Sequence, residues 1–185
     1  MKKMRVLMLA TLMGAAVSGQ AFADDTSGQS GTMTFNATLQ EGTCQLSGQN
    51  IDHNFGSLSK AMTLGPGWGN GTSWGVLVQY ADTITVSNCP SSVVSVKMTP
   101  TYTKMSGQTD VIDNSATNGS NVKMFISKDT ELKDANTYKS GTVYSYNVND
   151  GSVSIPMYSS VTKSKTTAIT AGAADFNVQL AFAYQ

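Results

Sequence analysis

The sequence predicts an all-β protein arranged as a two-sheet sandwich of short strands. Apolar and polar residues alternate in short runs, which is the pattern of strands with one buried face, and no long stretch follows the helical period. Gly-rich and Asn-rich spacers separate these runs, and only residues 128–135 would accommodate a short helical turn. Charged residues make up 13% of the chain, while Ser, Thr, Asn and Gly are abundant. This composition is typical of a secreted β-protein.

The alternating runs give the positions of the expected strands. The first run, 32–39, puts Phe35, Ala37 and Leu39 on one face. Further strands are expected at 83–86, 94–98, 122–126, 143–148 and 153–155. The Asn-Asp-Gly sequence at 149–151 predicts a tight hairpin between the last two runs. No internal repeat or linker divides the chain, so a single domain is expected.

The first residues are predicted to be an export signal. Lys2, Lys3 and Arg5 precede an apolar run that is too short to span a bilayer. Small residues at Ala21 and Ala23 place the predicted cleavage after Ala23, which leaves 162 of the 185 residues. Three of the 12 basic residues and none of the 12 acidic ones would leave with the signal, so the mature formal charge is −3. Nothing in this charge balance indicates a nucleic-acid partner.

Two cysteines, Cys44 and Cys89, are expected to form one disulfide. An exported chain matures in an oxidising compartment, where a pair of cysteines is normally bridged. In the entropic model, closing a loop of this length restricts the unfolded chain by about 4 kcal/mol. The alternative is a pair of unpaired, buried thiols, which the export signal disfavours.

The C-terminal segment carries the longest alternation in the chain. One face is apolar throughout and the other is polar or small. An edge strand this long and apolar would invite uncontrolled pairing with other chains. Either it is a central strand of a complete sandwich, or another strand must cover its edge, and the pattern alone leaves both open. The apolar face consists of Ala174, Phe176, Val178, Leu180, Phe182 and Tyr184.

The two ends of the chain together resemble the subunits of chaperone-usher pili. The run 31–39 leading into Cys44 is similar to the start of such pilins. Pilins end in an alternating apolar strand with a tyrosine next to last and a glycine fourteen places from the C-terminus, and here Tyr184 and Gly172 occupy those places. Two further segments resemble the family's second strand and the strand that carries its second cysteine, 52–58 and 84–89.

This resemblance implies an incomplete immunoglobulin-like sandwich, which lacks its seventh strand and leaves a groove beside the terminal strand. The implied function is that of a structural subunit of a surface fimbria, contributing to cell adhesion and assembled by donor-strand exchange. In that process an added strand pairs with the open edge, and its alternate side chains fill the groove. The implied groove residues are Gly172, Phe176, Val178, Leu180, Phe182 and Tyr184.

The resemblance also implies partners and a division of the chain. The partners would be a periplasmic chaperone, an outer-membrane usher and other pilin subunits, met in the periplasm and then in the fimbrium on the cell surface. The division would be a signal peptide at 1–23, a donor-strand extension at 24–33 and a pilin domain at 34–185. The extension has no bulky apolar residue before its last position, so it would bind mainly by backbone pairing. Its expected donor face is Thr26, Gly28, Ser30 and Thr32.

Residues that could carry out chemistry are few. His53 is the single histidine, and no second metal ligand or nucleophile stands beside it at a recognisable spacing, so we expect it to be solvent-facing or hydrogen-bonded. We therefore predict neither an enzyme nor a bound cofactor or metal. Scattered carboxylates lack the spacing of a calcium loop and are expected on the solvated surface: Asp110, Asp113, Asp129, Glu131 and Asp134.

Two tryptophans allow a second interpretation of the function. The Gly-rich segment 65–74 presents Trp68 and Trp74, which give the alternative function of a secreted carbohydrate-binding sandwich. The competing interpretation is that both indoles pack back onto the sandwich.

The Asn-rich stretch 114–121 is expected to be a plain surface loop. Several tyrosines are expected at sandwich edges with hydrated hydroxyls: Tyr102, Tyr138, Tyr144, Tyr146 and Tyr158.

Overall fold

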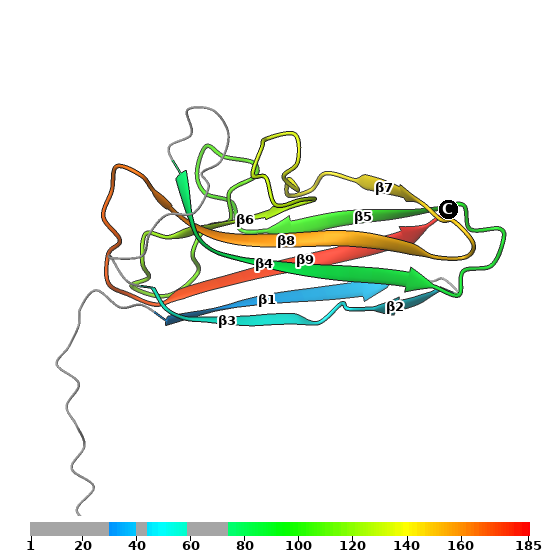
Figure 1. Ribbon diagram of the computed structural model, residues 1–185, viewed down its shortest axis with the longest axis horizontal. Coiled ribbons are helices and arrows are strands. Elements are labelled where there is room, and N and C mark those ends of the chain that lie inside the picture. The colour runs from blue at the N-terminus through cyan, green and yellow to red at the C-terminus, as the bar shows by residue number, and fades with distance from the viewer. Residues whose placement is uncertain (1–29, 40–43, 59–73) are drawn as a thin grey trace, which may run out of the picture.

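Two β-sheets pack face to face in the computed structural model, which describes residues 30–39, 44–58 and 74–185 (Figure 1). One sheet has the strand order β3-β1-β9-β5-β7 and the other the order β2-β4-β8-β6. No helix occurs in these ranges, so none of them contains a helix able to cross a membrane, and 128–135 forms bends and turns. The strands are β1 (Ser30–Leu39), β2 (Gln45–Ser47), β3 (Ile51–Ser57), β4 (Trp74–Ser87), β5 (Ser95–Tyr102), β6 (Lys123–Ser127), β7 (Tyr144–Asn147), β8 (Val153–Ser164) and β9 (Ala174–Tyr184).

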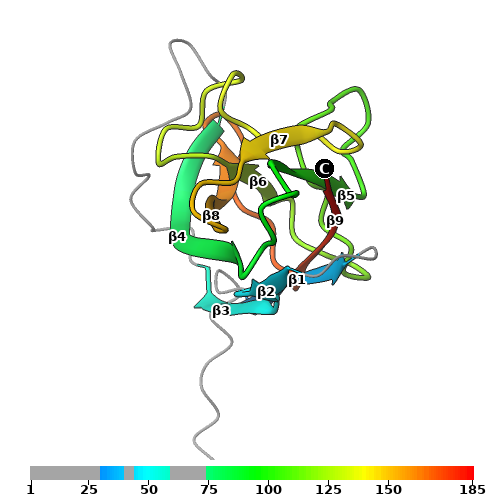
Figure 2. The ribbon, with the colours of Figure 1, turned by 90° about the vertical axis from the view of Figure 1, so that its right-hand side faces the viewer.

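Every predicted strand is present, because alternation fixes which residues can face a core. The end-on view shows the two layers (Figure 2), and the buried core residues come from strands of both. Ile84 and Val86 of β4 face Val96 and Met98 of β5, and all four are fully buried. The prediction is wrong at Val94, which precedes β5 and is 65% exposed.

The predicted hairpin at 149–151 is only partly correct. The chain does reverse there, with Asp150 and Gly151 at φ 49° and 71°, the left-handed values that an Asn-Asp-Gly turn supplies. However, β7 pairs with β5 in one sheet, while β8 pairs with β4 and β6 in the other. A single bridge, Asn149 to Ser152, joins the two sides of the turn. The turn therefore carries the chain from one sheet to the other.

The predicted disulfide between Cys44 and Cys89 is confirmed. The two Cα atoms are 4.3 Å apart, and the bond joins residues 45 positions apart in the sequence. It lies where β2 starts beside the end of β4, with Gln45 opposite Ser87 in the ladder. The bridge thus fastens the short edge strand β2 to the long strand β4.

The first strand occupies a position that the alternation did not reveal. β1 lies between β3 and β9, antiparallel to β3 and parallel to β9, and in Figure 1 the arrows of β1 and β9 point the same way. Gly31 is opposite Ala174, and the register continues without a break to Leu39 opposite Phe182. The two ends of the described chain are therefore joined along one edge of β9.

Candidate functional site: the two edges of the C-terminal strand

The predicted face of β9 is the face that the structure buries. Phe176, Val178, Leu180 and Phe182 are at most 2% exposed, and the residues between them point out of the sheet. Tyr184 is half-buried, and burial raises the pKa of its phenol. Its hydroxyl is enclosed without a hydrogen-bond partner among the described residues. β9 thus presents an unbroken apolar ridge to the core and needs a strand along each of its edges.

Strand β1 covers one of those edges. Met33 is opposite Phe176 and Phe35 is opposite Val178, and both β1 side chains are fully buried, while Ala37 beside them is half-buried. Backbone pairing along the strand satisfies the edge, and the alternate side chains enter the space between the sheets. Among the side chains that the structure describes, one hydrogen bond links the two strands, from Thr32 Oγ1 to an Asp175 carboxylate oxygen at 3.1 Å.

The structure describes two of the four residues expected to form a donor face. Thr26 and Gly28 fall outside the described residues, Ser30 starts β1, and Thr32 is exposed on the outer face of the sheet. The side chains that enter the core from this strand are those of Met33, Phe35 and Ala37. The same alternation that marked 32–39 as a strand carries this information, because Met33 continues its apolar face.

A glycine at the start of β1 is required by close packing. A Cβ at Gly31 would overlap the Ala174 carbonyl oxygen and the ring of Phe55. Phe55 of β3 in turn lies against Phe176, with the ring centroids 6.2 Å apart. Gly31 therefore lets β1 enter between β3 and β9 at the point where their aromatic side chains meet.

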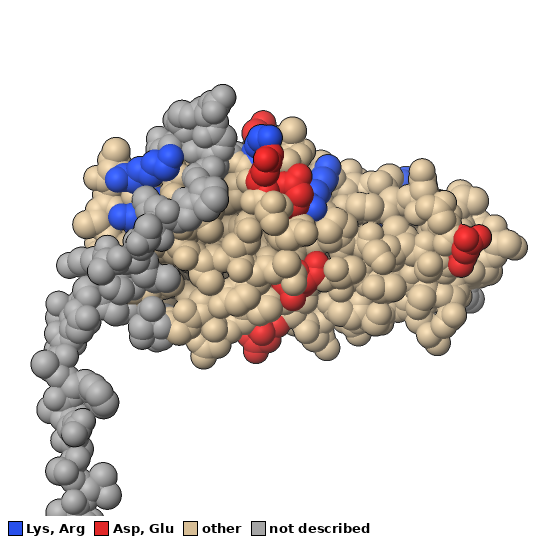
Figure 3. All heavy atoms as spheres, viewed as in Figure 1, with Lys and Arg blue, Asp and Glu red and all other residues tan. Residues whose placement is uncertain are grey.

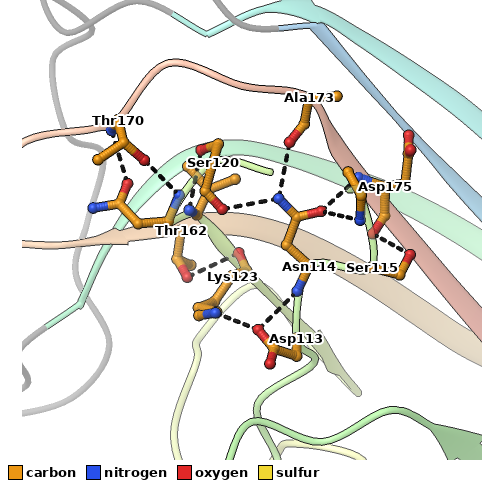
Figure 4. A network of polar contacts seen from close by, with 12 residues as sticks. Asp113, Asn114, Ser115, Ser120, Lys123, Thr162, Thr170, Ala173 and Asp175 are labelled. Atoms are coloured by element: carbon orange, nitrogen blue, oxygen red, sulfur yellow. Dashed lines mark hydrogen bonds and ion pairs between the residues drawn. The ribbon is translucent and has the colours of Figure 1, made fainter. Parts of the chain in front are cut away.

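The opposite edge of β9 is held by β5 and by the loop 113–120. β5 pairs antiparallel with β9 from Val96 opposite Tyr184 to Tyr102 opposite Val178. Beyond Tyr102 the loop takes over the pairing of β9, as Figure 4 shows. The backbone N–H of Ser115 donates to the Asp175 carbonyl at 2.9 Å, and its hydroxyl donates to the same oxygen at 2.9 Å.

Asn114 is the centre of this loop, and all of its side-chain hydrogen-bonding capacity is used. Its amide nitrogen donates to the carbonyls of Ser120 and Ala173, both at 2.9 Å. Its amide oxygen accepts from the backbone N–H of Asp175 at 2.9 Å and of Ala116 at 3.0 Å. The segment 114–121 is a surface loop as expected, but it also has a structural role that the sequence did not indicate. The name clamp is used below for Asn114, Ser115 and Ser120 with their bonds to residues 173–175.

Gly172 is explained by the same loop. Its φ is 141°, and a Cβ would lie 2.5 Å from the Asn118 carbonyl oxygen and 2.8 Å from the Ser120 nitrogen. Both the backbone conformation and the lack of space exclude a side chain. Gly172 thus allows the loop 113–120 to pass close to the backbone just before β9 begins.

The remaining candidates have structural positions. His53 is hydrogen-bonded, as one of its two expected environments required: its Nε2 lies 2.7 Å from an Asp82 carboxylate oxygen. Trp74 is the first residue of β4 and not a loop residue; it is half-buried, and its ring meets Phe125 edge-on at 6.1 Å. Trp68 lies outside the described residues. Within the described ranges, no three His, Cys, Asp or Glu side chains gather as a metal site would require.

Two surface expectations are wrong. Asp110 is 4% exposed, and burial raises the pKa of its carboxyl. Tyr138 is fully buried, and its hydroxyl lies 2.6 Å from that of Tyr146 and donates to the Pro156 carbonyl at 2.9 Å. Tyr102 is buried too, with its hydroxyl donating to the Tyr138 carbonyl at 2.7 Å. These tyrosines are internal hydrogen-bond donors that tie the 103–143 region to the sandwich.

Few charged side chains are visible on the face of the molecule shown in Figure 3. They gather mainly along its upper border, and most of this face is formed by uncharged residues. Ion pairs among the described residues include Lys123 with Asp113 and Lys139 with Asp134. Most of this face of the sandwich thus carries no charge.

The architecture matches solved structures of pilus subunits. The crystal structure of the P pilus rod subunit PapA has a TM-score of 0.56 at 20% identity, over 77% of this chain and 99% of that chain. A structure of a chaperone-usher pilus has a TM-score of 0.51 at 19% identity, over 82% and 93%. The chain has the pilin fold. The predicted all-β, immunoglobulin-like sandwich with one disulfide is therefore confirmed. Comparison with protein-family models and with curated proteins finds no match.

Proposed function

We propose that this chain is a structural subunit of a surface fimbria, assembled by donor-strand exchange and contributing to cell adhesion. The observation that carries the proposal is the place of β1. It lies between β3 and β9, parallel to β9, with Met33 and Phe35 buried beside the β9 ridge. A strand in this position provides what a groove in a pilin requires, namely backbone pairing and alternate apolar side chains.

The energetics of this strand favour replacement by an equivalent one. Burying a Met or Phe side chain contributes about 1.5 to 3 kcal/mol, and the backbone bonds of β1 would be remade by any strand of similar sequence. We therefore assign the donor role to 30–39, with Met33, Phe35 and Ala37 as its inserting face, in place of a polar face within 24–33. The segment before it, including the predicted signal peptide, stays a prediction from sequence.

The partners follow from the same exchange. In the periplasm a chaperone would supply the strand that completes the groove, and an usher would direct its replacement by the first strand of another subunit. The polymer is then a chain of sandwiches, each completed by its neighbour. The likeness to pilus subunits supports this reading, because it covers nearly the whole length of those chains.

The test uses peptides that copy residues 30–39 and compete with β1 for its place. The wild-type chain is incubated with excess labelled peptide, and stable complexes are counted by native mass spectrometry. The native peptide and its Asn36→Asp variant should be taken up, because Asn36 is exposed, whereas the Phe35→Asp variant should not, because position 35 is fully buried. Uptake of no peptide up to the onset of unfolding, together with a chain that stays monomeric, would contradict the proposal.

A further inference from the structure

The strand β3 forms the outer wall beside β1 and has little backbone support of its own. In the described part of the chain, β3 pairs with β1 and with no other strand. Withdrawal of β1 would therefore remove every ladder hydrogen bond that β3 makes. If β3 detached at that moment, an incoming strand could pair with β9 on one side but would have no strand to pair with on its other side.

Three side-chain contacts join β3 to β4 in the opposite sheet. His53 Nε2 lies 2.7 Å from an Asp82 carboxylate oxygen. The His53 ring stacks on Tyr80, with the centroids 4.1 Å apart and the planes 6° from parallel. The Tyr80 hydroxyl donates to the Asn54 carbonyl at 3.4 Å. None of these contacts involves β1, and in the end-on view β3 and β4 lie on the same side of the molecule (Figure 2).

Partial burial strengthens the contact between His53 and Asp82. Their side chains are 22% and 20% exposed, so water screens the pair less than it would a surface pair. His53 also stands on the inward face of β3, at a position between Ile51 and Phe55 that alternation reserves for the core. A polar residue at that position indicates a specific partner, and the partner belongs to the other sheet.

We propose that His53, Tyr80 and Asp82 form a fastener that holds β3 in place while the groove changes its strand. The inference rests on the proposed strand exchange. With β3 already held, an incoming strand binds a formed groove and does not bear the cost of ordering its wall. Without the fastener, only a fraction of open subunits has the wall in place, and the apparent affinity for a donor strand falls by that fraction. These three are positioning residues, because their contacts act on the place of β3. His53 is also the register partner of Met33 in the ladder, whereas Asp82 belongs to β4 in the opposite sheet, so Asp82→Ala tests the fastener without changing a residue that pairs with β1.

Apolar anchoring is the competing explanation for a stable wall. Ile51, Phe55 and Leu58 are all buried, and they could hold β3 against the core without help. The two explanations differ in what happens when the polar contacts are removed. Apolar anchoring predicts no change in the affinity of the open groove for a strand, and the fastener predicts a loss.

The experiment measures that affinity in the full chain. A Phe35→Asp chain has a first strand that cannot enter the core, so its groove is free for a labelled peptide copying native residues 30–39. Binding is followed by fluorescence anisotropy. In this background His53→Ala and Asp82→Ala should each raise the Kd by about tenfold. The matched control is Gln79→Ala, which removes a 2.8 Å bond from the same strand β4 to Ser160 but does not reach β3, and should change the Kd less than about twofold.

A second measurement separates positioning from general stability. In the chain with native Phe35, the three alanine variants should lower the Tm by similar amounts, because each loses a half-buried polar contact. If the Phe35→Asp chain folds only with peptide, the peptide concentration for half-maximal recovery from denaturant replaces the Kd. Equal Kd values in all variants would overturn the fastener alone. A native peptide that does not bind the Phe35→Asp chain with its fastener intact would overturn strand exchange itself.

Discussion

The two edges of β9 are held in different ways, although both border the same apolar ridge. Along one edge, β5 pairs antiparallel, and the clamp adds side-chain hydrogen bonds from Asn114 and Ser115 and a backbone hydrogen bond from Ser120. Along the other, β1 pairs parallel, and one side-chain hydrogen bond from Thr32 accompanies the backbone ladder. One edge is held by contacts specific to this chain, and the other is covered by a strand that another strand with a similar apolar face could replace.

In the proposed strand exchange, this difference would let the sandwich change one strand without losing its fold. Parallel pairing is slightly weaker per residue than antiparallel pairing, and generic backbone bonds are available to any strand. The clamp, in contrast, is specific to this chain, because Asn114 bonds four groups that only this loop and this strand bring together. Stability is thus concentrated on the β5 side, and replaceable pairing on the β1 side.

The largest effect should follow from a charge in the shared ridge. Leu180→Asp puts a carboxylate where the side chain is 1% exposed, at a cost of several kcal/mol, which is comparable with the stability of a whole domain. Gln179→Asp, one position away on the exposed face, should be tolerated. The measurement is the yield of folded subunit, alone and co-purified with a chaperone. Equal yields for the two variants would show that the inward face of β9 is misassigned.

The next largest effect should come from a side chain at Gly172, where the loop 113–120 lies close to the backbone. Gly172→Ala combines a left-handed backbone with an overlap against Asn118 and Ser120, and should destabilise by about 3 kcal/mol. Gly141→Ala is the matched control, since Gly141 has φ 78° but open space around its Cα, and should cost about 1 kcal/mol. Denaturant titration of both variants gives the two values. Equal losses would mean that the loop does not press on Gly172.

The comparison of the edges is tested directly by removing one side-chain contact from each. Asn114→Ala leaves the Asp175 N–H and the Ser120 carbonyl without their partner, removes one of the two hydrogen bonds to the Ala173 carbonyl, and should cost about 2 kcal/mol. Thr32→Val removes the side-chain bond to Asp175 on the β1 edge, at an exposed position, and should cost less than about 0.5 kcal/mol. Chemical unfolding at neutral pH measures both. A larger loss for Thr32→Val would reverse the assignment of the fixed and replaceable edges.

The faces of the strands could be predicted from sequence because they depend on local order alone. Alternation identified the buried side of β9 and the burial of Phe35, and export context predicted the bond between Cys44 and Cys89. What alternation does not contain is the neighbour of each strand. The sequence at 149–151 predicts a reversal of the chain. Packing across the core decides whether the chain then stays in the same sheet.

The missed residues share one property, which is that their partners are distant in sequence. Asn114 looks like a loop residue because its role depends on Ala173 and Asp175, about sixty positions away. Asp110 and Tyr138 look like surface residues because composition places their types there, and only the folded loops bury them. For the same reason, the sequence marked His53 as structural but did not identify Asp82 as its partner.

The last prediction concerns alkaline pH, which should loosen the β5 side first. Burial raises the pKa of the Tyr102 and Tyr138 phenols, so both stay neutral in the folded chain at a pH where an unfolded tyrosine ionises, near 10. Above that pH the unfolded state binds fewer protons than the folded one, and stability falls as pH rises. The slope should be about 1.4 kcal/mol per pH unit for each such tyrosine.

The Tyr102→Phe variant separates this titration from general alkaline damage. At pH 7 it should be less stable by about 1 kcal/mol, because the hydroxyl that bonds the Tyr138 carbonyl is gone. Between pH 10 and 11 its free energy of unfolding should fall less steeply with pH than that of the wild type. The difference between the two slopes should equal the contribution of one tyrosine. Urea unfolding at several pH values measures both effects. Parallel curves for the two proteins would show that Tyr102 does not hold its proton through folding, and that the β5 edge owes its stability to the clamp alone.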